Sequence, residues 1–341
     1  MDPLTLSVVV PTYNRAHLLG RAIASVLREI GPGDEVLVVN DGSTDNTEEL
    51  VKGFADTRVR YFRQANAGPG AARNRGVAEA TGDLLAFLDS DDEWLPGKTL
   101  PQRNFMAARP DVLCSFTDIA DHSGRRRTLA SWQADQHGWR EAMGAPMKYS
   151  SFADPPEGIP DFDVYSGDVY RMEMHASYFF CDTMMVRRSV AGDQVRFTEG
   201  IATWEDWECF GRLARLGPFV YLDYLGAIQH SHSGPRVTDA NWVRGPQSRL
   251  VVLQNVWGAD PAFLAEFGEE YHALVRQQRL YRVRQLLREG RTLEARQEVR
   301  TLSGVPVLYR VLSRLPGNLV ESVAKLRSVA AASATRMTDS L

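Results

Sequence analysis

The sequence predicts an α/β protein with a mostly parallel sheet flanked by helices and a helical C-terminal appendage. Over the first 110 residues, short β-branched runs alternate with helical patterns, as they do in successive βαβ units. A chain of 341 residues, 44% of them hydrophobic, is long enough for one large α/β domain plus an appendage. From about residue 260 onward the pattern becomes helical and rich in arginine.

Four strands are predicted in this first part, at residues 6–10, 35–39, 58–62 and 84–88. Helical patterns follow the first three, over residues 18–27, around Leu50 and Val51, and over residues 71–80, where Gly82 stops the last of them. Each strand ends in a polar loop that precedes a helix. Because such loops gather at one edge of a parallel sheet, a nucleotide-sized pocket is predicted there.

The fourth of these loops is acidic. Asp89, Asp91 and Asp92 come directly after the apolar run that ends at Leu88. A hard divalent cation takes oxygen ligands, usually one or two carboxylates together with substrate phosphates and water. The run therefore predicts a metal-held phosphate ligand, and the alternative is a solvated acidic turn that caps the following helix.

The first two loops offer groups suited to a nucleoside. Pro11 rigidifies the first turn and Tyr13 presents a ring face for stacking, although Thr12 or Asn14 as a helix cap beside a packed tyrosine explains the loop equally well. In the second loop, Asp41 is able to accept from a base imide or a ribose hydroxyl, and turn formation alone is the alternative.

The third loop offers an amide and a cation. Asn66 precedes the glycines, of which Gly68 permits close approach of a ligand, and Arg73 lies on the first turn of the next helix, aimed where a diphosphate would lie. The alternative is an ordinary surface arginine.

The composition of the chain and the absence of certain motifs argue against several classes of protein. A net charge of −4 gives no basic footprint for nucleic acid, and no apolar run approaches the roughly 20 residues of a membrane-spanning helix. The chain lacks a P-loop ending and a dinucleotide-binding glycine motif. Since no signal peptide is evident, the expected location is the cytoplasm. Cys114, Cys181 and Cys209 have no metal-type spacing and are expected to be buried free thiols.

Taken in order, four motifs resemble those of the family 2 glycosyltransferases of GT-A fold, over roughly residues 5 to 235. They are Val9-Val10-Pro11-Thr12-Tyr13-Asn14-Arg15, Val39-Asn40-Asp41-Gly42-Ser43-Thr44-Asp45, Asn66-Ala67-Gly68 to Arg73-Asn74, and Asp89-Ser90-Asp91-Asp92. The resemblance implies a nucleotide-sugar donor, commonly a UDP sugar, a divalent cation (Mn²⁺ or Mg²⁺) on the diphosphate, and inversion at the anomeric carbon. One group of residues is implied to bind the donor: Pro11, Thr12, Tyr13, Arg15, Asp41, Asn66, Gly68, Arg73, Asp89 and Ser90. Asp89, Asp91 and His230 are implied to serve the metal, although His230 and His232 depart from the usual Tyr-Arg-x-His form and the choice between them stays open.

A catalytic base is sought in the second half of the chain. Glu205 and Asp206 open a helical pattern that ends at Gly217, where the helix dipole favours ionised carboxylates. The alternative is simple dipole complementation. The resemblance implies that Asp206 is the base and that Glu205 supports it or binds acceptor. One base suffices, because a neutralised nucleoside diphosphate departs without the acid that a glycosidase needs.

The rest of the chain is less informative. Residues 121–178 form an aromatic stretch with Pro and Gly, which is either an acceptor wall or an insertion whose aromatic side chains fill its own core. Helices are predicted at 263–289 and 293–302. An amphipathic segment at 305–329 is suited to packing on the catalytic domain or on another subunit, and alternatively to an anionic membrane surface.

The prediction is therefore a metal-dependent inverting glycosyltransferase that moves a sugar from a nucleotide-sugar to a hydroxyl acceptor. The donor-binding half is expected at 1–110, the acceptor-binding and catalytic-base half at 111–259, and the helical region at 260–341. The acceptor is a glycan, lipid-linked glycan, peptide or small molecule. The alternatives are a non-catalytic nucleotide-sugar-binding scaffold and a sugar nucleotidyltransferase, although the latter carries a Gly-rich loop after its first strand that this chain lacks.

Overall fold

The computed structural model describes residues 4–127, 129, 138–201, 203–230 and 245–321. The chain divides into two compact units, each of which is assembled from two segments. The first contains Met1–Ile201 and Glu205–Gly234, and the second contains Ala202–Trp204 and Pro235–Leu341.

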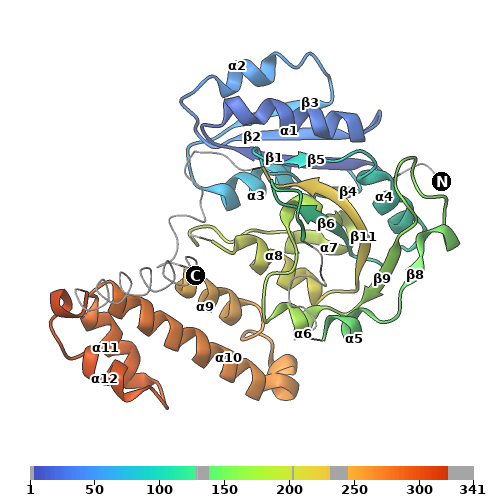
Figure 1. The fold of residues 1–341 in the computed structure, drawn as a ribbon. Helices are drawn as coiled ribbons and strands as arrows, with labels where there is room; N and C mark the ends of the chain where they lie inside the picture. The colour runs from blue at the N-terminus through green and yellow to red at the C-terminus, as the bar shows by residue number, and fades with distance from the viewer. Residues whose placement is uncertain (1–3, 128, 130–137, 202, 231–244, 322–341) are drawn as a thin grey trace, which may run out of the picture. The chain divides into compact units, whose positions relative to one another are not determined.

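The first unit is built on one large sheet (Figure 1). Its hydrogen-bonded path runs β3-β2-β1-β4-β10-β6-β11-β9-β8, with β5 added to β11 and β7 added to β6. The strands are β1 (Leu6–Thr12), β2 (Glu35–Asn40), β3 (Val59–Arg63), β4 (Leu84–Phe87), β5 (Glu93–Trp94), β6 (Cys114–Ala120), β7 (Arg126–Arg127), β8 (Met147–Lys148), β9 (Asp163–Gly167), β10 (Met185–Arg187) and β11 (Phe219–Ile228).

Most of the long strands run in one direction. β1 pairs in parallel with β2 and β4, β2 with β3, and β6 with β11. β10 is antiparallel to both β4 and β6, so β6 and β11 run the same way as β1 to β4. The predicted α/β fold with a mostly parallel sheet is confirmed, and the carboxyl ends of β1, β2, β4, β6 and β11 lie at the same edge.

Helices cover both faces of this sheet, because alternate strand residues point to opposite sides. Val8 and Val10 belong to the core cluster that includes the apolar side of α1, whereas Val9 contacts α3 on the other face. The helices of this unit are α1 (Ala16–Glu29), α2 (Thr47–Lys52), α3 (Pro69–Glu79), α4 (Thr99–Ala108), α5 (Trp139–Met143), α6 (Tyr170–Glu173), α7 (Arg188–Ala191) and α8 (Glu205–Ala214), with short 3₁₀ turns η3 (Tyr149–Ser151), η4 (Cys181–Thr183) and η5 (Gly192–Gln194).

Residues 121–178 are more regular than the sequence predicts. Their described part contains β7, α5, β8, η3, β9 and α6. Several of its aromatic rings are buried, namely Trp139, Tyr149, Phe162 and Tyr170. Trp139 packs edge-on against Tyr165 and Tyr221, and Tyr149 stacks on Phe162. Tyr149 and Phe162 belong to the core cluster of the whole first unit, and Trp139 packs on Tyr221 of β11, so these rings do not form a separate core of the insertion. The role of this segment as an acceptor wall stays a prediction, and Trp132 lies outside the described residues.

The second unit is helical. It contains α9 (Gly245–Asn255), α10 (Pro261–Arg288), α11 (Thr292–Thr301) and α12 (Val307–Leu312). Asp260 caps α10 by accepting from the backbone N–H groups of Ala262 and Phe263, and the helix kinks at Phe267. The two predicted helices at 263–289 and 293–302 correspond to α10 and α11. Of the predicted segment 305–329, residues 322–329 lie outside the described residues. Among the described helices, none combines the length and the apolar character that crossing a membrane requires.

Candidate active site

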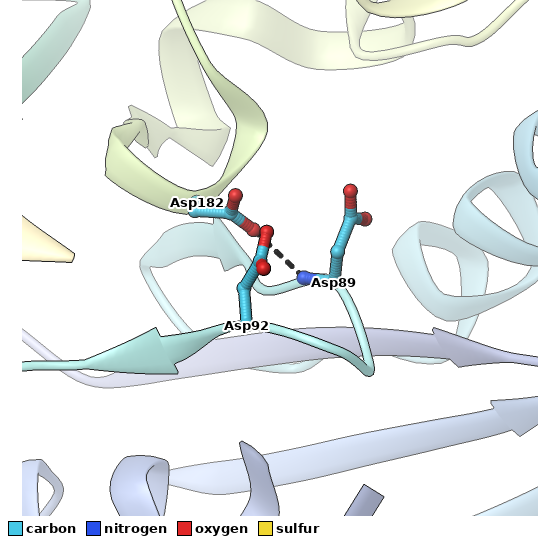
Figure 2. A group of neighbouring side chains, drawn as sticks. All are labelled: Asp89, Asp92 and Asp182. Carbon is cyan, nitrogen blue, oxygen red and sulfur yellow. Dashed lines mark hydrogen bonds between the residues drawn. The ribbon is translucent and has the colours of Figure 1, made fainter. Parts of the chain in front are cut away.

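Three aspartates meet at the edge of the sheet where β4 ends (Figure 2). Asp89 and Asp92 lie in the loop after β4, and Asp182 lies in η4, just before β10. Because β10 runs antiparallel to β4, the start of β10 adjoins the end of β4. Carboxylate oxygens of the three residues lie within 4.8 Å of one another. We call these three residues the aspartate cluster.

Backbone groups hold the aspartate cluster in place. The backbone N–H of Asp89 donates to Oδ1 of Asp182 over 2.8 Å, and that of Asp92 donates to the carbonyl of Asp89 over 3.0 Å. The indole Nε1 of Trp94 donates to the carbonyl of Asp182, and the backbone N–H of His230 donates to Oδ1 of Asp92. Three segments of the chain, namely residues 89–94, the turn η4 and the residues after β11, thus fix the cluster.

Asp89 pairs with Arg73, but Asp92 and Asp182 form no ion pair with any residue that the structure describes. Asp92 and Asp182 are 4% and 2% exposed. Burial, together with the neighbouring carboxylates, raises the pKa of both side chains well above the ordinary range. Crowded carboxylates in a poorly solvated place need a proton or a cation, and hard oxygen donors at this spacing suit Mg²⁺ or Mn²⁺. The donor set therefore fits a divalent cation.

Asp91, which the family resemblance implies as a metal ligand, is not one of the three clustered residues. Its carboxylate pairs with the guanidinium of Arg15, and its backbone carbonyl accepts from Nη2 of Arg21 over 2.7 Å. Asp89 is thus brought together with Asp92 and Asp182 rather than with Asp91. The sequence-based roles of Asp91 as a metal ligand and of Arg15 as a donor-binding residue stay predictions.

A buried lysine packs on Trp94, the residue whose indole holds Asp182. Lys98 is fully buried, its Nζ lies 4.2 Å from the ring centroid of Trp94, and it donates to Gln102. Burial lowers its pKa to about 7, while the charges of Glu29 and Asp182 oppose that shift. A lysine in a predicted helix start gives no sign of this position, so sequence reasoning missed it.

The first two loops of the sheet edge are tied together. The backbone N–H of Asn14 donates to Oγ of Ser43, and Oδ1 of Asn14 accepts from the backbone N–H of Thr44. Asn14 adopts a left-handed conformation with φ of 51°. Tyr13 next to it is 47% exposed, whereas Thr12 is buried at the end of β1. The tyrosine ring is therefore open to a planar ligand.

Asp41 shapes the third loop. Its carboxylate accepts from the backbone N–H groups of Ala67 and Gly68 over 3.0 and 2.8 Å, and from the side-chain amide of Gln64. Asn66 between these contacts is exposed. Since an ionised carboxylate has about four acceptor positions, these three bonds leave room for one further donor. The predicted role of Asp41 toward a base or ribose thus stays a prediction.

Arg73 connects the aspartate cluster with the start of α8. Its guanidinium is buried, donating from Nη2 to Oδ1 of Asp89 over 2.7 Å and from Nη1 to Oε1 of Glu205 over 2.8 Å. It also lies over the ring of Phe197 at 5.4 Å. The family resemblance implies that Arg73 contacts the base or the diphosphate of the donor. In the structure Arg73 hydrogen-bonds to the carboxylates of Asp89 and Glu205.

Asp206 follows Glu205 in the first turn of α8. Its Oδ1 accepts from the backbone N–H of Trp207 over 2.8 Å. Burial raises the pKa of Asp206 to about 7, helped by the charge of Glu205 and opposed by that of Arg73. A carboxylate with such a pKa is matched to general-base work near neutral pH. A helix dipole by itself would lower the pKa of a carboxylate at this position, so the rise reflects burial beside Glu205. The role of Asp206 as the base stays a prediction.

The remaining candidates fall as follows. The ring of His230 lies with Nε2 3.1 Å from Glu93, beside the cluster, and His232 lies outside the described residues. Ser90 is buried. The three cysteines, Cys114, Cys181 and Cys209, are free and buried as predicted. Sequence reasoning missed Asp182, whose only local signal is an acidic residue at the end of an aromatic run, Tyr178-Phe179-Phe180-Cys181.

Comparisons with known proteins identify a family and several relatives. The family model for glycosyl transferase family 2 matches residues 7–189. The succinoglycan biosynthesis protein ExoO of Rhizobium meliloti is 31% identical over 271 residues, which cover 77% of this chain and 69% of ExoO. An Escherichia coli protein, UDP-Glc:alpha-D-GlcNAc-diphosphoundecaprenol beta-1,3-glucosyltransferase WfgD, is 38% identical over 107 residues, covering 31% of this chain and 42% of its own.

A solved structure shares the fold. Staphylococcus aureus TarS, residues 1–349 in complex with UDP-GlcNAc, superposes with a TM-score of 0.55 at 19% identity, covering 94% of this chain and 89% of the TarS chain. By contrast, the aligned part of this chain spans only 15%, 17% and 18% of the length of three Rickettsia glycosyltransferases that it matches.

The sheet and its match to TarS show that the chain has the GT-A fold. The chain belongs to glycosyl transferase family 2, since the family model spans more than half of its residues and ExoO is related over most of its length.

Proposed function

We propose that this protein is an inverting glycosyltransferase that moves a sugar from a nucleotide-sugar, a UDP sugar in the first instance, to a hydroxyl group of a glycan or lipid-linked glycan. The observation that carries the proposal is the bridge made by Arg73 between Asp89 of the aspartate cluster and Glu205 beside Asp206. Phosphate-binding and base functions would therefore lie next to each other, as transfer in one step requires.

The donor is proposed to bind at the loops after β1 to β4. Tyr13 would stack on the base, and Asn66 and Asp41 would bind the nucleoside. Asp89, Asp92 and Asp182 would hold a divalent cation, which neutralises charge on the diphosphate when it is bound. The names of relatives support the donor class, because TarS was solved with UDP-GlcNAc and with UDP, and WfgD is named for UDP-Glc.

The chemistry of the chain's own residues follows from their charges. Asp206 would take the proton of the acceptor hydroxyl. The oxygen of that hydroxyl would attack the anomeric carbon on the side opposite the departing nucleoside diphosphate. Arg73, already between Asp89 and Glu205, would keep the two carboxylate groups at a fixed separation and offset their charge. In-line attack of this kind inverts the configuration.

The acceptor class rests on relatives alone. ExoO is named for succinoglycan biosynthesis and WfgD for a diphosphoundecaprenol-linked acceptor. A hydroxyl of a saccharide is the acceptor group that these names have in common, and we carry only that group over to this chain.

A thermal-shift screen tests the donor half of the proposal. UDP sugars are added to the purified protein with and without Mn²⁺, and the matching donor is expected to raise the melting temperature only when the cation is present. In Asp182→Asn the cation-dependent part of the shift should be lost. In the surface variant Asp111→Asn, whose aspartate is paired with Arg109 in solvent, it should persist. No shift with any activated sugar would contradict the proposal.

The same screen compares two sets of metal ligands. If the aspartate cluster holds the cation, Asp182→Asn abolishes the cation-dependent shift, whereas Asp91→Asn, which alters a carboxylate outside the cluster, leaves most of it. The reverse order would assign the cation to Asp89 and Asp91, as the resemblance implies. Either result identifies the ligands without reference to turnover.

A further inference from the structure

The second unit presents apolar and basic side chains together over the segment that contains α12. Between Ser303 and Val320 the sequence has two arginines and no acidic residue. The exposed members of this segment form what we call the apolar–basic surface: Val307, Leu308, Arg310, Val311, Arg314, Leu315 and Leu319.

These apolar side chains are not needed by the unit's own core. That core consists of Val283, Leu286, Leu287, Ala295 and Val320. The inner side of the segment already packs against it through Tyr309 and Leu312. The outer side chains remain 40–73% exposed, with Val307 and Leu319 at 73% and 55%. Isolated exposed aliphatic residues need no explanation, but five within 13 residues indicate a surface that another phase or molecule covers.

A hollow of about 560 Å³ adjoins this surface. Arg314 and Leu315 line it from one side, and Arg296 and the 72%-exposed Leu293 line it from α11. Arg296 donates from Nε to the carbonyl of Ser313, which keeps its guanidinium at the rim. Arg310 and Arg314 form no ion pair with any described residue. Glu294 also lines the hollow, where it pairs with Arg291 over 2.7 Å. The rest of the edge is formed by arginines and aliphatic side chains, a combination suited to a phosphate group that is attached to an acyl chain.

We propose that the apolar–basic surface docks on an anionic lipid bilayer, with the aliphatic side chains among the acyl chains and Arg310 and Arg314 at the headgroup phosphates. Charge complementarity selects this occupant. A second copy docking through the same surface would bring like charges together. Residues 322–341 carry Lys325, Arg327 and Arg336 against Asp339, so this segment does not complement the surface either.

Vesicle flotation of the full chain tests the proposal without donor or acceptor, so its outcome is independent of the proposed enzymatic function. The protein is expected to float with phosphatidylcholine vesicles that contain phosphatidylglycerol and not with phosphatidylcholine alone, and added salt should weaken binding. Replacing both arginines (Arg310→Gln with Arg314→Gln) should lower the partition coefficient about tenfold or more.

A matched pair of variants separates this surface from general stickiness. Leu319→Asp should abolish flotation, whereas Leu100→Asp, which alters a leucine of similar exposure (53%) on α4 of the first unit, should leave it unchanged. Far-UV circular dichroism and thermal unfolding verify that both variants fold. Absence of flotation in the parent protein would overturn the proposal, as would equal loss in both leucine variants. Concentration-dependent dimerisation that Leu319→Asp removes, without vesicle binding, would assign the surface to a second copy instead.

Discussion

Asp206 carries the proposed proton transfer, and its surroundings decide the pH at which it works. Its pKa is raised to about 7, first by burial and then by the charge of Glu205. Only the ionised form accepts a proton. We therefore predict that kcat/KM falls about tenfold per pH unit below about pH 7 and levels off above it. A pH–rate profile measures this, and a flat profile between about pH 5 and 8 would exclude Asp206 as the base.

The aspartate cluster should affect how the stability of the folded protein depends on pH. Since the folded-state pKa of Asp182 lies above its unfolded value, the folded protein binds more protons, and stability is lost as the pH rises through the folded-state pKa. At neutral pH without cation, Asp182→Asn should raise the free energy of unfolding by on the order of 1–3 kcal/mol. The amide oxygen can still accept from the backbone N–H of Asp89.

Urea unfolding in the presence of a chelator measures this gain, and repetition with Mn²⁺ provides the second half of the test. The cation should stabilise the parent protein but not the variant, so the order of stability reverses. Asp111→Asn serves as the control, because an exposed aspartate paired with Arg109 should change stability by less than about 1 kcal/mol in either medium. If Asp182→Asn lowers the free energy of unfolding without cation, the carboxylate of Asp182 does not destabilise the folded parent protein, and the prediction is wrong.

At this scale the sequence predicts residue types better than partners. It predicts carboxylates at the end of β4 and at the start of α8, since both follow clear secondary-structure signals. It does not predict that Asp182 completes the cluster, because that contact depends on the antiparallel insertion of β10 beside β4. Nor does it predict the pairing of Asp91 with Arg15, which joins loops 76 residues apart.

Among the elements, α3 lies unusually close to β1. A Cβ atom built at Gly76 would come within 2.3 Å of Cγ1 of Val9. Since Val9 lies in the middle of β1 and is fully buried, neither the helix nor the strand can yield easily. This close approach positions α3, and with it Arg73, against the end of β4.

Gly76→Ala is therefore predicted to destabilise the protein by about 1–3 kcal/mol through overpacking. The matched control is Gly20→Ala on α1, where the nearest atom, Cδ1 of Leu50, lies 3.8 Å from the built Cβ. That substitution should stabilise by about 0.5–1 kcal/mol, because alanine is the better helix former. Chemical unfolding of both variants compares them, and equal effects of the two substitutions would contradict close packing of α3 on β1.

The elements that the sequence predicts correctly share one property, namely a strong local pattern. β1, β2 and β4 are runs of β-branched and apolar residues, β3 combines Val, Tyr and Phe with two arginines, and α1 has a continuous apolar stripe. The elements that it misses are short or depend on tertiary pairing. β9, with the sequence Asp-Val-Tyr-Ser-Gly, is a strand only because it hydrogen-bonds to β11 on one side and to β8 on the other.

For the whole molecule, the structure describes two compact units, of which the first holds every candidate donor and base residue. The helical unit begins earlier than the sequence suggests, since α9 precedes residue 260. The division into donor-binding and acceptor-binding halves within the first unit stays a prediction. The apolar–basic surface belongs to the second unit, which is why its function can be tested apart from catalysis.

The measurement that tests the central claim most directly is the release of nucleoside diphosphate from a panel of UDP sugars with Mn²⁺, followed in parallel for the parent protein and Asp206→Asn. We predict slow release by the parent with its matching donor, faster when a saccharide acceptor is added, and a rate about 10²–10⁴-fold lower in the variant at unchanged donor affinity. Equal rates in the two proteins, or donor binding without any release by the parent, would contradict the claim that Asp206 is the base of a sugar transfer.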